Sequence, residues 1–417
     1  MTAIGAMIGL LVAIILILRK YNAAYSLILG AVAGGLAGGL SLSETVSFMI
    51  EGAKDISPAI LRILTAGVLS GVLIKTGAAS RIALTIIQTL GERKSTIALV
   101  LSTFLLTAIG VFIDVAVITV APITLAIGKK MNYSRMTLLL AMIGGGKCGN
   151  IISPNPNTII AAENFNAALS SVMYVNLIPA LIGLLFSVWL VKRFPFKGEW
   201  VTESLDEAEE AGPLPSFAGS MAGPLVAILL LALRPVCGIV IDPLIALPAG
   251  GLTGILLMRR CRQLRISLAY GLEKMLLVAV LLIGTGTIAG IIKHSTLKDG
   301  LLVALNGLSL DESFIAPVAG ALMSAVTAST TAGATLASAS FADVILAAGI
   351  PAVWGAAMVN SGATILDHLP HGSFFHATAG AVDMKLKERL RLIGYESLIG
   401  AVLAMLTFSG YQLLFLF

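Results

Sequence analysis

The stretch GGGKCGNIISPNPNT, residues 144–158, interrupts a long apolar segment of the chain. Its glycines and two prolines are poor helix formers, and its lysine and three asparagines are polar. A continuous membrane span does not tolerate such a composition, because backbone groups inside a bilayer need internal hydrogen bonds. The stretch therefore predicts a span whose helix is broken at its centre.

The composition of the chain indicates a membrane protein. Its 417 residues are 57% hydrophobic and 12% charged, whereas soluble domains have about 25% charged residues. The first twenty residues lack the basic start and the cleavage site of a signal peptide, so we expect them to form a retained first span. The net charge of +5 requires no nucleic-acid partner, because the basic residues cluster at the ends of apolar segments.

No cofactor is expected from the sequence. Cys148, Cys237 and Cys261 are scattered and form no CxxC motif, which disfavours a disulfide or a zinc site. Aromatic residues make up only 6% of the chain, which argues against a haem or flavin pocket. The sequence has no GxxxxGK[ST] motif, so we expect no ATP-driven motor.

Apolar segments long enough to cross a bilayer recur from end to end. The expected spans lie at about 2–19, 23–41, 57–77, 135–165, 170–192, 220–240, 242–258, 272–293, 351–379 and 392–416. Two further apolar stretches, 95–128 and 313–348, have polar residues at their centres. We predict that each of these two stretches enters and leaves the membrane on the same side, as a re-entrant hairpin.

Basic clusters predict the orientation in the membrane. They lie at residues 19–20, 93–94, 129–130, 192–193, 259–262 and 385–391. Cytoplasmic loops are enriched in Lys and Arg, and all six clusters can be cytoplasmic only if both termini lie outside. The first hairpin would then open to the cytoplasm and the second hairpin to the exterior.

A polar linker at residues 196–216, expected to be cytoplasmic, divides the chain into two similar halves. Three matches occur in the same order: LVAIILILR (11–19) with LVAILLLALR (225–234), AGGLAGGL (33–40) with AGGLTGIL (249–256), and AMIGGGKCGNIISPNPN (141–157) with AMVNSGATILDHLPHGS (357–373). They predict a duplication with repeats at 1–195 and 217–417. Each repeat would hold five spans and one hairpin, and an odd number of spans gives the repeats inverted topology.

The predicted fold is therefore an all-α polytopic membrane protein with a broken span in each repeat, at 135–165 and 351–379. Broken helices expose half-helix termini, whose free N–H groups favour anions and whose free carbonyl groups favour cations. A pair of interrupted spans in corresponding positions is the best sequence indication of a transporter's substrate site.

Two of these segments resemble signature regions of a known family. SPNPNTIIAAE (153–163) and SGATILDHLPHGSFF (361–375) resemble the gluconate permease family of proton symporters, within the ion transporter superfamily. Family members carry Pro-Pro-His-Pro-Gly where this chain has residues 153–157, and an acidic residue after the histidine that aligns with His368. Here Asp367 precedes that histidine, so the chain resembles a divergent member of the family. The resemblance implies a homodimer with a scaffold domain and a moving transport domain, and hairpin tips that hold a carboxylate.

Polar residues at the breaks and at the second hairpin are the candidate substrate ligands. They are Lys147, Asn150, Ser153, Asn155, Asn157, Thr158, Ser329, Thr330, Thr331, Asn360, Ser361, Thr364 and His371. An unpaired ammonium at bilayer depth is costly, so we expect Lys147 to pair with a substrate carboxylate or a buried acid. The alternative for the neutral residues is that they only satisfy backbone groups freed by the breaks.

Proton coupling needs a buried group that can be loaded and emptied. Histidine has an unperturbed pKa near 6.5, so we expect His368 to carry the proton first, then Asp367, with Asp114 of the first hairpin as the alternative. Asp114 could instead form a salt bridge with Lys147 or another base and fix the hairpin tip. No metal is expected, because one acid and two histidines beside Pro370 leave the coordination incomplete.

Three classes of function remain open on the residues alone: a carrier, an intramembrane enzyme and a channel. Paired breaks, inverted repeats and opposed hairpins favour a carrier with alternating access. One lysine among many amides and hydroxyls favours gluconate or a related hydroxy monocarboxylate as the substrate. A di- or tricarboxylate is the second choice, and sodium remains open beside protons. The expected location is the inner membrane of a bacterium, and the expected partners are the organic anion, protons, lipids and a second copy of the chain.

Overall fold

The computed structural model describes residues 1–91, 94–193, 198–201, 213–297 and 311–415. The first-half helices are α1 (Ala3–Leu18), α2 (Ala23–Ala37), α3 (Leu42–Asp55), α4 (Ser57–Lys75), α5 (Ala78–Leu90), α6 (Ser95–Ala108), α7 (Ile113–Met131), α8 (Arg135–Asn150), α9 (Pro156–Asn164), α10 (Leu169–Val175) and α11 (Leu177–Arg193). The second half has α12 (Phe217–Cys237), α13 (Pro243–Leu257), η2 (Cys261–Gln263), α14 (Leu264–Lys293), η3 (Glu312–Phe314), α16 (Ile315–Thr327), α17 (Thr330–Ala347), α18 (Ala352–Gly362), α19 (Ser373–Ala381) and α20 (Leu386–Phe415). Within the described ranges the chain is all helical, apart from one isolated bridge between Ser134 and Trp200. Most of the predicted linker, 202–212, lies outside the described residues.

Several helices are long and apolar enough to cross a membrane. They are α4, α12, α14, α17 and α20, and α10 with α11 forms one further span bent by 44°. Large apolar side chains such as Leu185, Leu229 and Leu256 remain exposed on the helices, which suits contact with lipid rather than water. The fold is therefore that of a multi-pass membrane protein.

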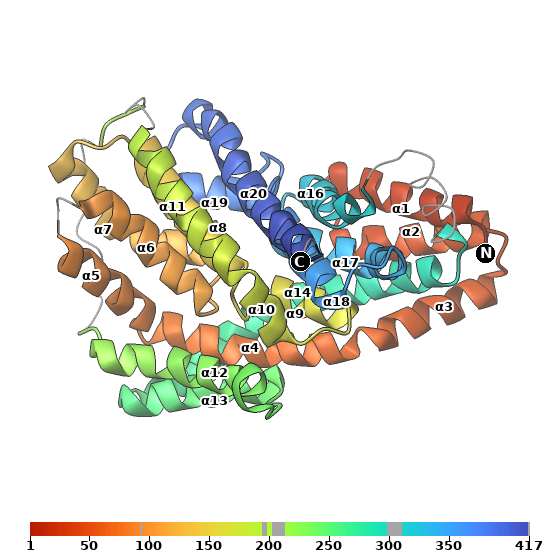
Figure 1. Cartoon of the computed structure of the whole chain (residues 1–417), viewed down its shortest axis with the longest axis horizontal. Coiled ribbons are helices and arrows are strands. Elements are labelled where there is room, and N and C mark those ends of the chain that lie inside the picture. Colours follow the sequence, from red (N-terminus) through yellow and green to blue (C-terminus); the bar gives the residue numbers. More distant parts are fainter. Residues whose placement is uncertain (92–93, 194–197, 202–212, 298–310, 416–417) are drawn as a thin grey trace.

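The helices fall into two groups, which we call the scaffold group (α1–α4 and α12–α14) and the core group (α6–α9, α11 and α16–α20). In the scaffold group α14 packs against α2, α3 and α4, and α13 packs against α4 and α12. In the core group α8 packs against α6, α11 and α20, which cross the molecule side by side (Figure 1). The groups meet where α14 contacts α17 and where α4 contacts α9.

Glycines let the helix pairs approach closely, and the same contacts occur in both halves. A Cβ on Gly9 of α1 would lie 2.7 Å from the carbonyl oxygen of Gly30 in α2. A Cβ on Gly223 of α12 would lie 2.9 Å from the carbonyl oxygen of Gly250 in α13. Small residues of this kind are the usual contact of membrane helices, because they let backbones touch. The pairs α1–α2 and α12–α13 are therefore packed alike.

Two helical hairpins carry the segments predicted as re-entrant. In the first, α6 and α7 are joined through Gly110, whose φ is +107° and which lies in the region that favours glycine. In the second, α16 and α17 are joined at Ala328, and Ser329 caps α17 by accepting from Ala332 N at 3.3 Å. α6 packs on α8 and α16 packs on α18, so each hairpin lies against the first part of a broken span.

Both predicted breaks coincide with gaps between helices. α8 ends at Asn150, and α9 begins at Pro156 with Asn155 as its N-cap. Proline suits this first position because its missing N–H would have no helical partner there. In the second half α18 ends at Gly362 and α19 begins at Ser373.

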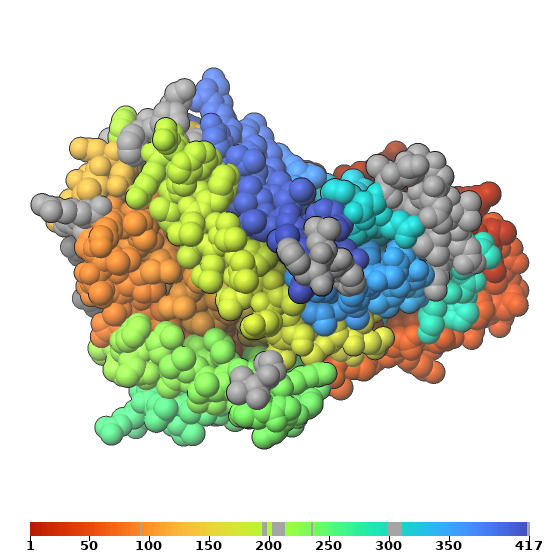
Figure 2. All heavy atoms as spheres, viewed as in Figure 1, coloured from red at the N-terminus to blue at the C-terminus, as the bar shows by residue number. Residues whose placement is uncertain are grey.

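Short helices outside the predicted spans were not expected from the apolar pattern. α3 follows the second span and has an amphipathic sequence, and a capping box between Ser41 and Glu44 fixes its start. α5 is a second such helix, before the first hairpin. In the space-filling view the helices of the two halves form one continuous body (Figure 2).

Candidate functional site

A central cavity of about 450 Å³ lies between the two hairpin tips, the two breaks and α14. Its lining residues are Phe112, Ile113, Asp114, Val115, Asn150, Asn157, Lys274, Leu277, Val278, Ala328, Ser329, Thr330, Thr331, Asp367, Ser373 and Phe374. Small-molecule sites commonly have volumes of about 300–1,000 Å³. The cavity is therefore large enough for a small organic solute.

Four helices present their first turns to this cavity. They are α7 at Ile113, α9 at Asn157, α17 at Thr330 and α19 at Ser373. The first N–H groups of a helix have no helical acceptor, and the helix dipole adds partial positive charge there. Two of these turns come from the hairpin tips and two from the breaks, so the fold itself concentrates positive potential at the cavity.

Asn150 is the clearest ligand-facing amide of the cavity. Its side chain is 3% exposed, and its Nδ2 donor has no hydrogen-bond partner among the described residues. A buried donor without an acceptor is unfavourable by about 1–3 kcal/mol. Because Asn150 lines the cavity, this donor is suited to an oxygen atom of a bound solute.

The other amides of the first break bond mainly to each other. Asn155 accepts from Thr158 N at 3.2 Å, and its Nδ2 donates to Asn150 O at the same distance. Asn157 donates to Asn360 Oδ1 at 2.7 Å, and Asn360 donates to Thr158 Oγ1 at 3.2 Å. Of these side chains only Asn150 and Asn157 line the cavity, and the rest hold the two breaks together.

Lys147 is fully buried and pairs with Asp367 across the two breaks. Its Nζ donates to Asp367 Oδ1 and to the Thr364 carbonyl oxygen, and to His368 Nδ1 at 3.1 Å. The other oxygen of Asp367 accepts from Thr330 Oγ1 at 2.5 Å, which connects the pair to the second hairpin tip. Asp367 lines the cavity, whereas Lys147 lies behind it.

His368 lies behind Asp367 and is fully buried. Its Nε2 is 3.0 Å from the Ile393 carbonyl oxygen, which can only accept, so Nε2 carries a hydrogen. Its Nδ1 lies 3.1 Å from Lys147 Nζ and 3.0 Å from Asp367 Oδ1. A neutral ring accepts from the lysine and a protonated ring donates to the carboxylate, so both states have a partner.

Two buried charged residues of α20 extend this cluster and were missed in the sequence. Glu396 Oε2 lies 4.0 Å from His368 Nδ1, and Arg389 forms a two-pronged ion pair with Glu396. Arg389 also lies over the ring of Phe375, 4.6 Å from its centre. The sequence placed Arg389 in the basic cluster 385–391, but its side chain has no exposed surface. Arg389 and Glu396 are seven residues apart in the sequence, which places them on the same face of a helix. This spacing could have indicated that the two residues form a pair.

Asp114 and Lys274 are two further charged residues that line the cavity. Asp114 lies in the first turn of α7 and accepts from Val115 N at 2.9 Å. Lys274 is a half-buried residue of α14, with its Nζ 5.5 Å from the centre of the Tyr270 ring. Sequence analysis missed Lys274, because its position near the expected start of a span resembled that of an interfacial residue.

The remaining predicted site residues lie away from the cavity. Ser361 donates to Met358 O and Thr364 to Ser361 O, which are ordinary bonds to the preceding turn. Ser153 is buried, and its Oγ has no partner among the described residues. His371 is exposed, with its Nε2 3.1 Å from the Val326 carbonyl oxygen. No group of three or more potential metal ligands occurs in the part of the chain that the structure describes.

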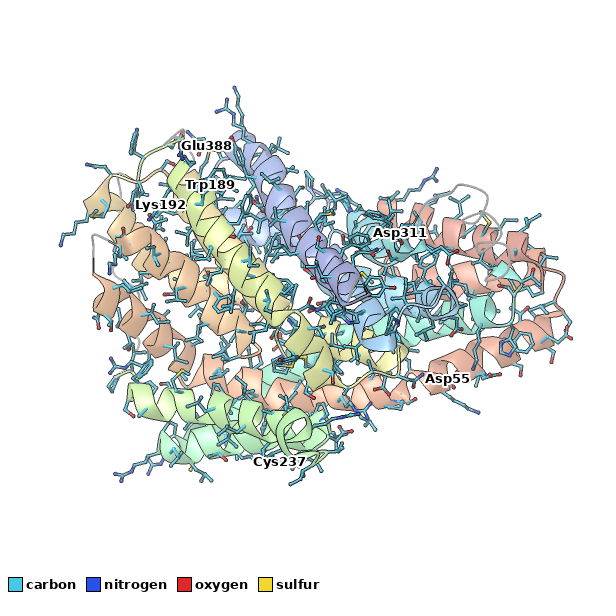
Figure 3. All side chains as sticks on the ribbon, in the orientation of Figure 1. Asp55, Trp189, Lys192, Cys237, Asp311 and Glu388 are labelled. Atoms are coloured by element: carbon cyan, nitrogen blue, oxygen red, sulfur yellow. The ribbon has the colours of Figure 1, made fainter. Side chains whose placement is uncertain are left out.

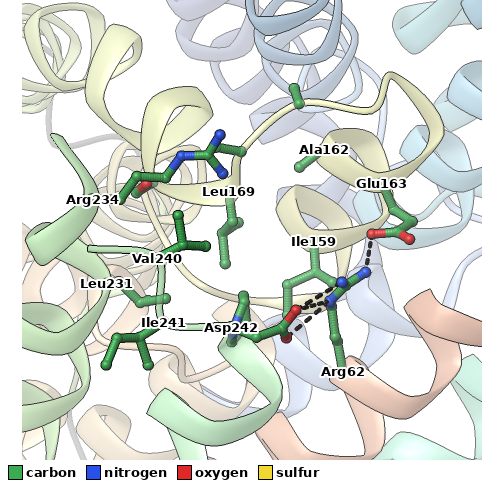
Figure 4. Close-up of a pocket in the computed structure, with 14 residues that line it drawn as sticks. Arg62, Ile159, Ala162, Glu163, Leu169, Leu231, Arg234, Val240, Ile241 and Asp242 are labelled. Atoms are coloured by element: carbon green, nitrogen blue, oxygen red, sulfur yellow. Dashed lines mark hydrogen bonds and ion pairs between the residues drawn. The ribbon is translucent and has the colours of Figure 1, made fainter. Parts of the chain in front are cut away.

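A second charged cluster joins the two groups of helices outside the central cavity (Figure 4). Arg62 of α4 donates to Asp242 at 3.0 and 2.8 Å, and it pairs with Glu163 of α9. The hydrogen bonds from Arg62 lower the pKa of Asp242, which caps α13. A separate cavity of about 550 Å³ lies beyond Glu163, between α9, α17 and α14.

A helical membrane bundle around a cavity lined by both polar and apolar side chains is an architecture that suits a solute transporter, and comparisons with known proteins agree. Residues 1–250 match the family model described as GntP family permease, and residues 220–308 match that of the Na+-H+ antiporter family. The chain is 53% identical over 406 residues to an uncharacterized transporter of Haemophilus influenzae, covering 97% of each chain. The chain belongs to the GntP permease family. It is a permease rather than an enzyme.

The chain is also similar in sequence to a more distant relative and in fold to a solved structure. Over 186 residues the chain is 29% identical to the Gnt-II system L-idonate transporter of Escherichia coli, covering 42% of this chain and 41% of that one. The crystal structure of the YdaH transporter of Alcanivorax borkumensis superposes with a TM-score of 0.69 at 13% identity, covering 90% of this chain and 89% of that one. The second similarity shows that the two proteins share a fold.

Proposed function

We propose that this permease takes up gluconate or a related hydroxy monocarboxylate together with a proton, as a secondary active transporter. The observation that carries the proposal is the central cavity, where the first turns of α7, α9, α17 and α19 meet the side chain of Lys274. Helix N-termini and a lysine favour a carboxylate. Neutral donors and acceptors around them suit hydroxyl groups.

The polar residues among the lining favour a sugar acid over a purely apolar acid. Ser329, Thr331, Ser373 and the unpaired amide of Asn150 provide partners for several hydroxyl groups. A solute that lacks such hydroxyl groups would leave these donors unpaired, which is unfavourable in a buried site. The name of the L-idonate transporter, a relative, also points to a sugar acid.

We propose an elevator-type cycle, in which the core group moves past the scaffold group of a homodimer. The equivalent glycine contacts of α1–α2 and α12–α13 support two repeats, each with five spans and a re-entrant hairpin. The proposed location is a bacterial inner membrane with both termini outside. The proton would be carried by one of the buried groups at the breaks and the first hairpin, His368, Asp367 or Asp114.

Uptake into proteoliposomes tests this function directly. Purified protein should accumulate labelled gluconate when the outside is acidic, and accumulation should stop when a protonophore removes the gradient. Unlabelled idonate should compete, whereas glucose, which lacks the carboxylate, should not. Absence of accumulation for every sugar acid tried would reject this proposal.

The second candidate is a sodium- or proton-coupled carrier of a di- or tricarboxylate. The match of residues 220–308 to a Na+-H+ antiporter family raises the question of sodium. In the same proteoliposomes, uptake of labelled citrate driven by a sodium gradient without a proton gradient would favour this candidate.

A further inference from the structure

We infer that Lys274 binds the substrate carboxylate and that Asp114, its counter-charge in the empty cavity, takes up the coupled proton. The inference rests on the proposed function, because it names the recognition and coupling groups of that same cavity. It assigns a substrate role to a residue of α14 in the scaffold group, whereas all the candidate ligands expected from the sequence lie at the breaks and the second hairpin.

Lys147 is not available for a substrate carboxylate. An ammonium group has three hydrogens to donate, and Lys147 has three acceptors: Asp367 Oδ1, the Thr364 carbonyl oxygen and His368 Nδ1. Its side chain is fully buried and is separated from the cavity by Asp367. Binding a substrate there would require the Lys147–Asp367 pair to break.

Lys274 has the opposite environment. It lines the cavity and stands over the Tyr270 ring, and no carboxylate lies within ion-pair distance of it among the described residues. Its three hydrogens are therefore free for an anion that enters the cavity. Asn150, on the same cavity wall as Asn157, offers a buried unpaired donor for a second oxygen of that anion.

The charges around the empty cavity cancel. With both carboxyl groups ionised, Asp114 and Asp367 contribute two negative charges, which balance the two positive charges of Lys147 and Lys274. Behind them Arg389 and Glu396 also cancel each other. A bound monocarboxylate adds one negative charge, and an uncompensated charge in a poorly solvated site is strongly unfavourable. One proton per carboxylate restores the balance.

Asp114 is the group whose proton affinity should respond to the substrate. In the empty cavity it shares the field of Lys274, and a carboxylate bound to Lys274 replaces that favourable interaction by repulsion. The proton then moves from the acidic side of the membrane to the Asp114 carboxylate. By linkage, a protonated Asp114 strengthens substrate binding by the same factor.

The remaining ionisable groups near Asp114 are accounted for. Tyr270 of α14 interacts electrostatically with both Asp114 and Glu273, and Asp367 lines the cavity. The titratable residues on the helices packed against α7 are engaged elsewhere: Arg81 with Pro215 O, Arg135 with Asp383, His376 with Pro370 O and Lys147 with Asp367. His368 touches Asp367 from behind and does not line the cavity. The geometry thus favours Asp114 over His368 as the group that senses the substrate.

Gluconate binding to purified protein, measured by calorimetry in two buffers of different ionisation heat, tests the inference. The wild type should take up one proton per gluconate bound. Lys274→Gln should bind gluconate about thirtyfold more weakly or worse, because a desolvated charge pair is lost, and Lys274→Arg should recover part of the affinity. Lys75→Gln is the matched control, since Lys75 also stands over Tyr270, at 4.5 Å, but does not line the cavity.

Carboxylate binding by Lys274 and proton uptake by Asp114 are measured separately. Asp114→Asn should remove the proton uptake, so that gluconate binding no longer depends on pH and a proton gradient no longer drives accumulation. Wild-type affinity in Lys274→Gln would overturn the inference while leaving the proposed function intact. Proton uptake that persists in Asp114→Asn but is lost in His368→Gln would overturn the role of Asp114. A wild type that binds neither gluconate nor citrate would reject the proposed function and this inference with it.

Discussion

At the scale of single residues, Lys147 and Asp367 show how a buried charge pair can hold two interrupted helices together. Neither side chain has appreciable exposed surface. Each charge is compensated by the other and by further hydrogen bonds, to the Thr364 carbonyl oxygen and from Thr330 Oγ1. Burial of such a pair stabilises only when both partners are present. The pair therefore acts as a structural unit, which connects the end of α8 with the break after α18.

Removing one member of this pair should destabilise the protein more than removing both. Lys147→Met leaves Asp367 buried without its cation, an effect on the order of 3–5 kcal/mol. We expect the melting temperature of the detergent-purified protein to fall sharply in Lys147→Met and to recover partly in Lys147→Met/Asp367→Asn. Lys385→Ala is the control, because Lys385 pairs with Glu199 at the exposed surface and should leave the melting temperature unchanged. Additive losses in the double variant would contradict the pairing.

The polar residues at the breaks could be found from the sequence, but the sequence did not show which of them line the cavity and which bond only to one another. Lys147 and Asp367 stand out because charges are rare in apolar segments, and the pairing of Lys147 with a buried acid was one of two expectations. Arg389 and Lys274 were missed for one reason, since each lies near the end of an apolar run, where most basic residues face water. Only the packing of α20 and α14 distinguishes a buried or cavity-lining base from an interfacial one.

At the scale of elements, the close approach of α8 to α6 depends on glycines of the first break. A Cβ on Gly145 would lie 1.9 Å from the Val100 carbonyl oxygen, and one on Gly149 would lie 2.2 Å from that of Phe104. The glycine run that first indicated a broken span therefore serves mainly as a packing surface. Helix α8 continues through the glycine run to Asn150. The break begins five residues after Gly146, the third glycine of the run, and comprises residues 151–155.

Gly145→Ala should therefore push α8 away from α6 and displace Lys147 and Asn150. Overpacking of this kind destabilises by about 1–3 kcal/mol, so we expect a lower melting temperature and weaker gluconate binding. Gly394→Ala in α20 is the matched control, because a Cβ there meets nothing within 4 Å. Alanine in a helix with free space should be neutral or stabilise by up to about 1 kcal/mol. Equal effects of both substitutions would contradict the packing argument.

At the scale of the whole molecule, Arg62 links the scaffold group with the core group. It holds Asp242 of the scaffold group and Glu163 of the core group at once. If the core group moves during transport, the bond to Glu163 has to break while the bond to Asp242 can persist. Hydropathy could predict the presence of long apolar helices, because each needs only a run of apolar residues. It could not predict contacts between helices that are distant in the sequence.

The native cysteines test the orientation without any added probe. Cys237, which Figure 3 labels at the end of α12, and Cys261, just after α13, lie at opposite ends of α13 and are exposed. With both termini outside, a membrane-impermeant maleimide added to intact cells should modify Cys237 alone. Cys237→Ser should abolish labelling and Cys261→Ser should retain it, while buried Cys148 stays silent. Labelling of Cys261 alone would reverse the orientation.

The unequal lengths of the helices have a consequence for the surrounding lipid. α14 and α20 have 30 residues each, or about 45 Å, well above the roughly 30 Å of a hydrocarbon core. α1, α2 and α13 have 16, 15 and 15 residues, or about 22–24 Å. A flat bilayer does not match both sets. If α1, α2 and α13 cross the membrane as predicted, the long helices have to tilt or protrude and the acyl chains beside the short helices have to compress. We therefore expect the lipid around the protein to vary in thickness and to be thinnest along α1, α2 and α13.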